Sequence, residues 1–132
     1  MTDVLLVAKE LLYYMNIPTA RDNEILKELQ KSHDEGQVSD GLFKIFGEIV
    51  DAESKNPKWK KMLNSQQMAL VKAEATAHLM GQWNKFKMEL SNKPNTFFRV
   101  TTNGIFTRFV HRVKIGPRLS HTKLIHKTFT GN

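Results

Sequence analysis

The chain has 132 residues and no cysteine, which excludes disulfide bonds, thiol catalysis and cysteine-ligated zinc and favours a reducing, intracellular setting. Apolar residues make up 40% and charged residues 25%, as in one globular domain; no apolar run approaches the roughly 20 residues of a membrane span, and no signal peptide is expected. The net charge of +7 is unevenly distributed, since residues 1–84 carry 10 Lys/Arg and 12 Asp/Glu whereas residues 85–132 carry 10 Lys/Arg and one acid, Glu89.

Helical periodicity begins at the N-terminus. A first helix is expected over residues 2–16, capped by Thr2 or Asp3 and ended by Asn16-Ile17-Pro18. A second helix, capped by Thr19 or Asp22, should stop between residues 33 and 36. The apolar positions at helical spacing in these two helices are Val4, Leu5, Ala8, Leu11, Leu12, Ile25, Leu26 and Leu29.

The middle of the chain predicts two longer helices joined by a short one. Ser39 or Asp40 caps the first of them, and Asn56-Pro57 closes it. Trp59 and Met62 fall in a short helical connection. Ser65 is expected to cap a helix over residues 66–87. The apolar stripes of the two longer helices are Leu42, Ile45, Phe46, Ile49, Val50, Met68, Val71, Ala75, Leu79 and Trp83.

A last helix should begin near Pro94, whose missing N–H costs nothing in a first turn, and run to about Val113. Gly116-Pro117 stops it, and residues 118–132 are expected to be poorly ordered. The β-branched run over residues 100–102 leaves a short hairpin as the alternative there. The pattern therefore predicts an all-α fold of about five helices with a basic C-terminal tail.

No catalytic or metal-binding arrangement is found. None of the five histidines has a second ligand at the spacing of a zinc-binding helix. Glu48, Asp51 and Glu53 share one helix, where a solvated face is the plainer interpretation. The sequence also has no glycine-rich phosphate loop and no serine elbow. We therefore expect neither an enzyme, a metal site nor a cofactor.

On a helical wheel the last helix has two unlike faces. The apolar arc predicts a core face and consists of Phe98, Thr102, Ile105, Phe106, Phe109, Val110 and Val113. The other arc ends in cations and consists of Phe97, Thr101, Gly104, Arg108, His111 and Arg112, with Arg99 and Asn103 at its edges. Arginines can neutralise phosphates and an exposed Phe97 can stack on an unpaired base. The alternatives are a solvated face for the arginines and a core position for Phe97.

Two spaced segments resemble region two of bacterial sigma factors, and most of all the late-transcription sigma factors of T-even-type phages. In "LVKAEATAHLMGQWNKF" (70–86), the family's polymerase-binding helix is matched at Glu74, Leu79, Met80, Asn84, Lys85 and Phe86. After six residues, "KPNTFFRVTTNGIFTRFV" (93–110) matches the promoter-melting segment at Lys93, Thr96, Phe97, Thr107 and Arg108. The phage proteins also have a helix comparable with residues 41–52 and an end similar to "TTNGIFTRFVHRVK" (101–114).

This resemblance implies a sigma-like helical domain over residues 41–114, an N-terminal segment over 1–40 without an aligned counterpart, and a basic tail over 115–132. The helix bearing Ala73, Glu74, Thr76, Ala77 and Met80 would dock on the clamp helices of host core RNA polymerase. By the resemblance, the melted, AT-rich promoter element would contact Phe97, Val100, Thr101, Gly104, Thr107 and Arg108. The other predicted DNA-binding residues are Lys93, Arg99, Asn103, His111 and Arg112.

Late initiation in the infected bacterial cytoplasm is the implied activity, with a late co-activator and the sliding clamp as further partners. The sequence departs from the family at three places. Val100 and Thr101 occupy the positions of the family's paired tryptophans, and Pro94 replaces an aromatic residue. The end "LIHKTFTGN" is basic, whereas the family's clamp-binding tail is acidic. A stand-alone DNA-binding module and a polymerase-binding regulator without DNA contact are the two alternative functions.

Overall fold

The computed structural model describes residues 17–115. The expected helix over residues 2–16 and the expected disorder of residues 118–132 lie outside this range. Within it there are five α-helices and no strand, so the all-α prediction is confirmed. The elements are α2 (Ala20–Glu35), α3 (Asp40–Ser54), α4 (Pro57–Met62), α5 (Ser65–Gln82), the 3-10 helix η1 (Trp83–Lys85), α6 (Pro94–Val110) and the π-helix η2 (His111–Ile115).

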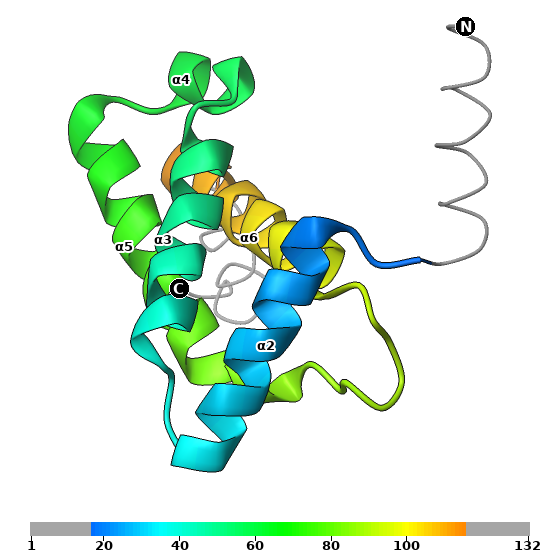
Figure 1. The fold of residues 1–132 in the computed structure, drawn as a ribbon. Helices are drawn as coiled ribbons and strands as arrows, with labels where there is room; N and C mark the ends of the chain where they lie inside the picture. The colour runs from blue at the N-terminus through cyan, green and yellow to red at the C-terminus, as the bar shows by residue number, and fades with distance from the viewer. Residues whose placement is uncertain (1–16, 116–132) are drawn as a thin grey trace, which may run out of the picture.

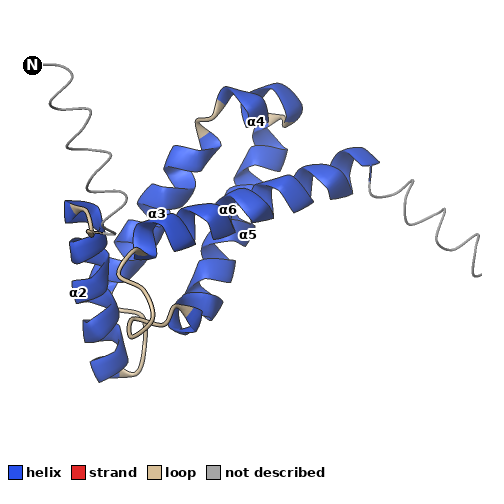
Figure 2. Cartoon of the chain, turned by 90° about the vertical axis from the view of Figure 1, so that its right-hand side faces the viewer, coloured by secondary structure: helices blue, strands red, loops and turns tan. Residues whose placement is uncertain are grey.

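Helices α3, α5 and α6 pack against one another, and α2 packs against α3 and α6 (Figure 1). Figure 2 shows α6 crossing α3 and α5, with the short α4 at one end of that pair. Within the described residues, no helix is both long and apolar enough to cross a membrane. The largest buried side chains come from all five helices and include Ile25, Leu29, Leu42, Phe46, Trp59, Leu79, Phe98 and Phe106.

Local signals set the ends of α2 and the start of α3. The Thr19 hydroxyl accepts the Asp22 amide at 3.1 Å, and the Asp22 carboxylate accepts the Thr19 amide at 2.9 Å, which is a capping box. Gly36 ends α2 in the left-handed conformation, with φ 74°. Ser39 caps α3 by accepting the Leu42 amide at 3.1 Å. These boundaries agree with the sequence prediction.

Three predicted boundaries differ from the structure: the start and the end of the helix expected over residues 66–87, and the end of the last α-helix. The helix expected over residues 66–87 is capped by Asn64, not Ser65, and its α-helical part ends at Gln82. The chain tightens through η1 and then turns, which buries Phe86. The last α-helix ends at Val110, because the backbone widens into the π-helix η2. The hairpin alternative for residues 100–102 is also wrong, since these residues are α-helical.

Helix α2 is joined to α6 by a buried carboxylate. Besides closing the capping box, Asp22 accepts the Asn95 amide at 2.9 Å, so one side chain serves the first turns of two helices. Lys93, at the N-cap position of α6, makes no side-chain cap. Part of the segment 1–40 thus shares one core with residues of the predicted sigma-like domain.

Candidate nucleic-acid interface

The two faces of α6 are those that its periodicity predicts. Six members of the apolar arc are buried, namely Phe98, Thr102, Ile105, Phe106, Phe109 and Val110, whereas Val113 is only partly buried. The Thr102 hydroxyl donates to the Phe98 carbonyl at 2.8 Å, which satisfies it inside the core. Helix α6 is therefore fixed on one side, and its opposite side faces outward.

The exposed side of α6 carries cations along its length. Arg99, Arg108 and His111 are all exposed. Among residues 17–115, no carboxylate forms an ion pair with either arginine, so both guanidinium groups keep their donors available to a ligand. Arg112 is different, because it donates to both Glu74 carboxylate oxygens, at 2.7 and 2.8 Å. Two of the four predicted cations of this face are thus unpaired arginines.

Phe97 lies at the edge of the core. Its side chain is 37% exposed, and its ring centroid lies 5.3 Å from that of Phe86 and 5.1 Å from that of Phe98. The contacts hold the ring in one place while part of it remains open to solvent. The Phe97 ring is therefore partly packed in the core and partly open to solvent, and its stacking on a base stays a prediction.

The other residues of α6 that are predicted to contact DNA differ in exposure and in their hydrogen bonds within the protein. Val100 is 65% exposed. Thr101, Gly104 and Thr107 are half-buried, and both hydroxyls donate to backbone carbonyls one turn earlier, at 2.8 and 2.9 Å. The Lys93 ammonium donates to the Ile17 carbonyl at 3.2 Å. At these positions the threonine hydroxyls and the Lys93 ammonium already donate within the protein, and Val100 is an exposed apolar side chain.

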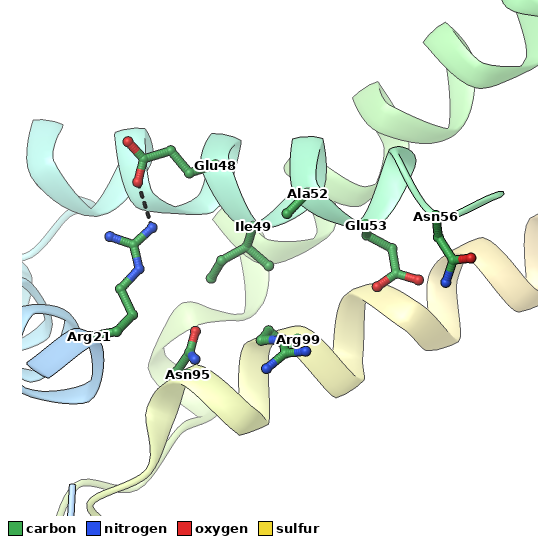
Figure 3. Close-up of a pocket in the computed structure, with 8 residues that line it drawn as sticks. All are labelled: Arg21, Glu48, Ile49, Ala52, Glu53, Asn56, Asn95 and Arg99. Carbon is green, nitrogen blue, oxygen red and sulfur yellow. Dashed lines mark hydrogen bonds and ion pairs between the residues drawn. The ribbon is translucent and has the colours of Figure 1, made fainter. Parts of the chain in front are cut away.

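A groove between α3 and α6 adjoins this exposed side. It encloses about 340 Å³, and Figure 3 shows Arg21, Glu48, Ile49, Ala52, Glu53, Asn56, Asn95 and Arg99 around it. A second hollow of about 430 Å³ shares Glu53, Asn56 and Arg99 with the groove and adds Thr96, Val100 and Asn103. The predicted residues Arg99, Val100 and Asn103 thus meet at one concave surface.

Charges within the groove are partly neutralised. Arg21 donates to Glu48 at 2.5 Å, and this hydrogen bond lowers the pKa of Glu48 and raises the pKa of Arg21. Glu53 accepts the Trp59 indole N–H at 2.7 Å and the Asn103 amide at 3.1 Å. Arg99 is consequently the groove's free cation among the described residues, and its partner in a complex would be an anion.

The predicted polymerase-binding residues lie on the outer side of α5. Ala73, Glu74 and Ala77 are exposed, and Thr76 and Met80 are half-buried. Leu70, one turn earlier, is also exposed. The Glu74–Arg112 ion pair joins this surface to Arg112, just beyond the C-terminal end of α6, so the two candidate sites adjoin.

Sequence reasoning missed several residues of the groove. Arg21, Asn95 and Asn56 come from three separate segments and meet only in the folded chain. Near Arg21, the sequence predicts a role only for Thr19 and Asp22, as helix caps. No sequence signal relates Arg21 to Arg99, because their proximity depends on the packing of α2, α3 and α6.

Comparisons with protein-family models, with curated proteins and with solved structures found no match to this chain. Within residues 17–115, no three His, Asp or Glu side chains stand close enough together to hold a metal ion. Among the described residues, the side chains of the candidate interface offer guanidinium groups without an ion pair, a partly open aromatic ring and a polar groove.

Proposed function

We propose that this protein is a minimal sigma factor of the phage late-transcription type. In this proposal it binds host core RNA polymerase through α5 and the melted, AT-rich upstream element of late promoters through α6. Initiation in the infected bacterial cytoplasm, with a late co-activator and the sliding clamp as further partners, belongs to the same proposal. The proposal is based on the resemblance of residues 70–86 and 93–110 to region two of sigma factors.

The proposed DNA binding is supported chiefly by the exposed side chains on the outer side of α6. Unpaired Arg99 and Arg108 can each neutralise a phosphate, and Phe97 holds a partly open ring against a fixed aromatic neighbour. A ring held in place loses little freedom on stacking with an unpaired base, and such a stack contributes about 1–3 kcal/mol. The chain carries no acid after Glu89, and two acids that reach this side from other helices are each engaged: Glu53 accepts the Asn103 amide, and Glu74 pairs with Arg112.

The polymerase half is supported by α5. Its exposed residues Leu70, Ala73 and Ala77 form an apolar stripe beside Glu74, and the small side chains of the two alanines let another helix approach closely. This surface adjoins the α6 surface through the Glu74–Arg112 pair. A polymerase bound on α5 would therefore hold promoter DNA within reach of α6.

The first test is co-elution of the full chain with bacterial core RNA polymerase on size exclusion at moderate salt, where loose electrostatic association is screened. A defined stoichiometry is expected. The variant Ala77→Arg should abolish co-elution, whereas Ala20→Arg, an exposed alanine of α2, should not. Separate peaks for the parent chain would overturn the polymerase half and favour the stand-alone DNA-binding module.

The second test is transcription from a late promoter of the phage that encodes the chain. Arg108→Gln and Phe97→Leu should each abolish promoter-specific initiation while leaving co-elution intact. Their matched controls are Lys31→Gln and Phe43→Leu, which alter an exposed cation and an exposed phenylalanine away from α6. Normal initiation by both α6 variants would sink the assignment of this surface and leave a polymerase-binding regulator.

A further inference from the structure

We propose a second nucleic-acid phosphate-binding surface, separate from α6, formed by the lysines in and around α4. Residues 54–73 contain five lysines and no acidic residue: Lys55, Lys58, Lys60, Lys61 and Lys72. The acids elsewhere in residues 1–84 outweigh these lysines, so that the net charge of this part of the sequence is −2. In the folded chain, however, the five lysines lie together in and around α4, at one end of the molecule. We call these five residues the lysine surface.

The lysine surface surrounds an open hollow of about 510 Å³. Lys55, Lys60 and Lys72 line it from three different elements, and Asn64 and Ser65 add an amide and a hydroxyl. Ammonium, amide and hydroxyl groups are the side-chain donors that phosphate oxygens accept. The hollow can therefore surround an anionic group with donors from several sides.

Little of this positive charge is compensated within the described residues. Asp51 pairs with Lys55 at 3.2 Å and with Lys72 at 3.0 Å, so one carboxylate serves two ammonium groups. The Lys58 ammonium lies 4.8 Å from the centroid of the Trp59 ring. Lys60 and Lys61 are exposed and form no ion pair in that part of the chain. The surface consequently keeps a net positive charge.

The lysines are carried by a fixed segment. Trp59, in the middle of the six-residue α4, is 1% exposed and donates its indole N–H to Glu53 at 2.7 Å. Its ring also packs on Phe106 of α6, with centroids 5.7 Å apart. This anchor holds α4 against the core, so a ligand need not order the backbone that carries Lys58, Lys60 and Lys61.

Nucleic acid fits this surface better than a membrane does. An interfacial membrane helix needs large apolar side chains beside its lysines to enter the bilayer. The aromatic residue of α4, Trp59, is instead committed to the core. A regular array of phosphates matches five lysines spread over three elements, and it requires no apolar insertion.

The test measures the affinity of the full chain for a 30-base-pair duplex, and for one of its strands, as a function of salt. Lys60→Gln/Lys61→Gln should reduce the slope of log affinity against log salt by about 1.8 for the duplex and by about 1.4 for the strand. The matched control Lys27→Gln/Lys31→Gln removes two exposed lysines of α2 and should leave both slopes unchanged. Thermal unfolding of each variant reports on the fold.

The outcomes separate this surface from the one on α6. Equal slopes for the α4 variant and its control would overturn the lysine surface, even if Arg99→Gln/Arg108→Gln weakens DNA binding. The reverse pattern would overturn the α6 contact and leave the lysine surface standing. Unchanged DNA slopes with lost binding to vesicles containing phosphatidylserine, or with lost co-elution with polymerase, would assign the lysines to a membrane or to an acidic protein instead.

Discussion

Asp22 is the residue on which the position of α6 depends most directly. Its carboxylate is 3% exposed and accepts three donors, the Thr19 amide, the Thr19 hydroxyl and the Asn95 amide, at 2.9–3.0 Å. Asp22→Ala would leave these donors without their partner, so we expect the free energy of unfolding to fall by about 2–4 kcal/mol. Urea denaturation measures this change.

Asp22→Asn tests whether the Asp22 side chain serves the first turns of both α2 and α6. An amide has one acceptor oxygen, so it can serve the first turn of α2 or that of α6 but not both, and the loss should be about half as large. The control is Asp34→Asn, at an exposed carboxylate that accepts the Gln30 amide at 3.0 Å; a change within about 0.5 kcal/mol is expected. Equal effects of Asp22→Ala and the control would contradict this role.

Asp51 makes a residue-scale prediction about pH. The hydrogen bond from Lys72 and then that from Lys55 lower the pKa of Asp51 from its ordinary 3.8. A carboxyl group with a depressed folded pKa stabilises the fold above its unfolded pKa, and this stabilisation is lost as the pH falls through the folded pKa. The contribution is therefore complete above about pH 4, declines as the pH falls below the ordinary 3.8, and is gone below the folded pKa; it is small because the pair is exposed to solvent.

Lys72→Gln should raise the pKa of Asp51 toward 3.8, as followed by the carboxyl carbon chemical shift in an NMR titration. Lys55 remains as the second partner, so the pKa should stay below the ordinary value until Lys55→Gln is added. Lys27→Gln, on α2, should leave it unchanged. A titration of Asp51 that is the same in Lys72→Gln and the parent would refute the pairing.

At the scale of elements, a glycine-to-alanine substitution should have opposite effects at two positions. Gly36 has a left-handed backbone, whereas Gly81 has a helical one. Gly36 ends α2 at φ 74°, where a side chain is strained, so Gly36→Ala should lower the free energy of unfolding by about 1 kcal/mol. Gly81 lies inside α5 with open space around its missing Cβ, so Gly81→Ala should raise that energy by about 0.5–1 kcal/mol. Thermal unfolding of both variants measures the two signs.

Gly47 provides the matched control, since it lies inside α3 and its Cβ would also meet open space. Gly47→Ala should stabilise the protein like Gly81→Ala. Destabilisation by both helix-interior substitutions would mean that the two positions need glycine for something other than backbone conformation. Stabilisation by Gly36→Ala would rule out the left-handed cap.

The elements also show which boundaries the sequence can predict. Thr19, Ser39 and Gly36 act on amides or carbonyls within a few residues, so their effect is visible in the sequence. The end of α5 is not local, because it depends on Phe86 turning inward to contact Phe98, whose ring centroid is 6.1 Å away. The π-helix η2 likewise follows no breaker in its own sequence, and we have no physical account of it.

At the scale of the molecule, the faces of α6 were predictable from a single period, but the surfaces around them were not. The groove beside Arg99 depends on Arg21 and Glu48 from other helices. The lysines of α4 form a local run of positive charge in the sequence. The net charge summed over residues 1–84 is −2, so this run is not apparent from the sum. Charge summed over long segments identifies a class of partner, whereas the fold decides where that charge gathers.

At the scale of the whole molecule, the shared core leads us to expect that α2 unfolds together with α3, α5 and α6. Ile25 and Leu29 of α2 are fully buried in the same core as Leu79 of α5, and Asp22 reaches α6. Leu29→Ala in the full chain should therefore lower the free energy of unfolding by about 2–5 kcal/mol, and the loss should be the same at every protected amide of α2, α3, α5 and α6. Native-state hydrogen exchange measures this amide by amide.

Leu79→Ala, in α5, is the matched control, because it removes the same atoms from the other side of the core. It should reduce protection in α2 as much as in α5 if the helices form one cooperative unit. If Leu29→Ala instead lowers protection in α2 alone, α2 belongs to a separate N-terminal unit with its boundary near residue 40. That boundary would follow the extent of the sigma resemblance, and the shared core would contribute contacts without cooperativity.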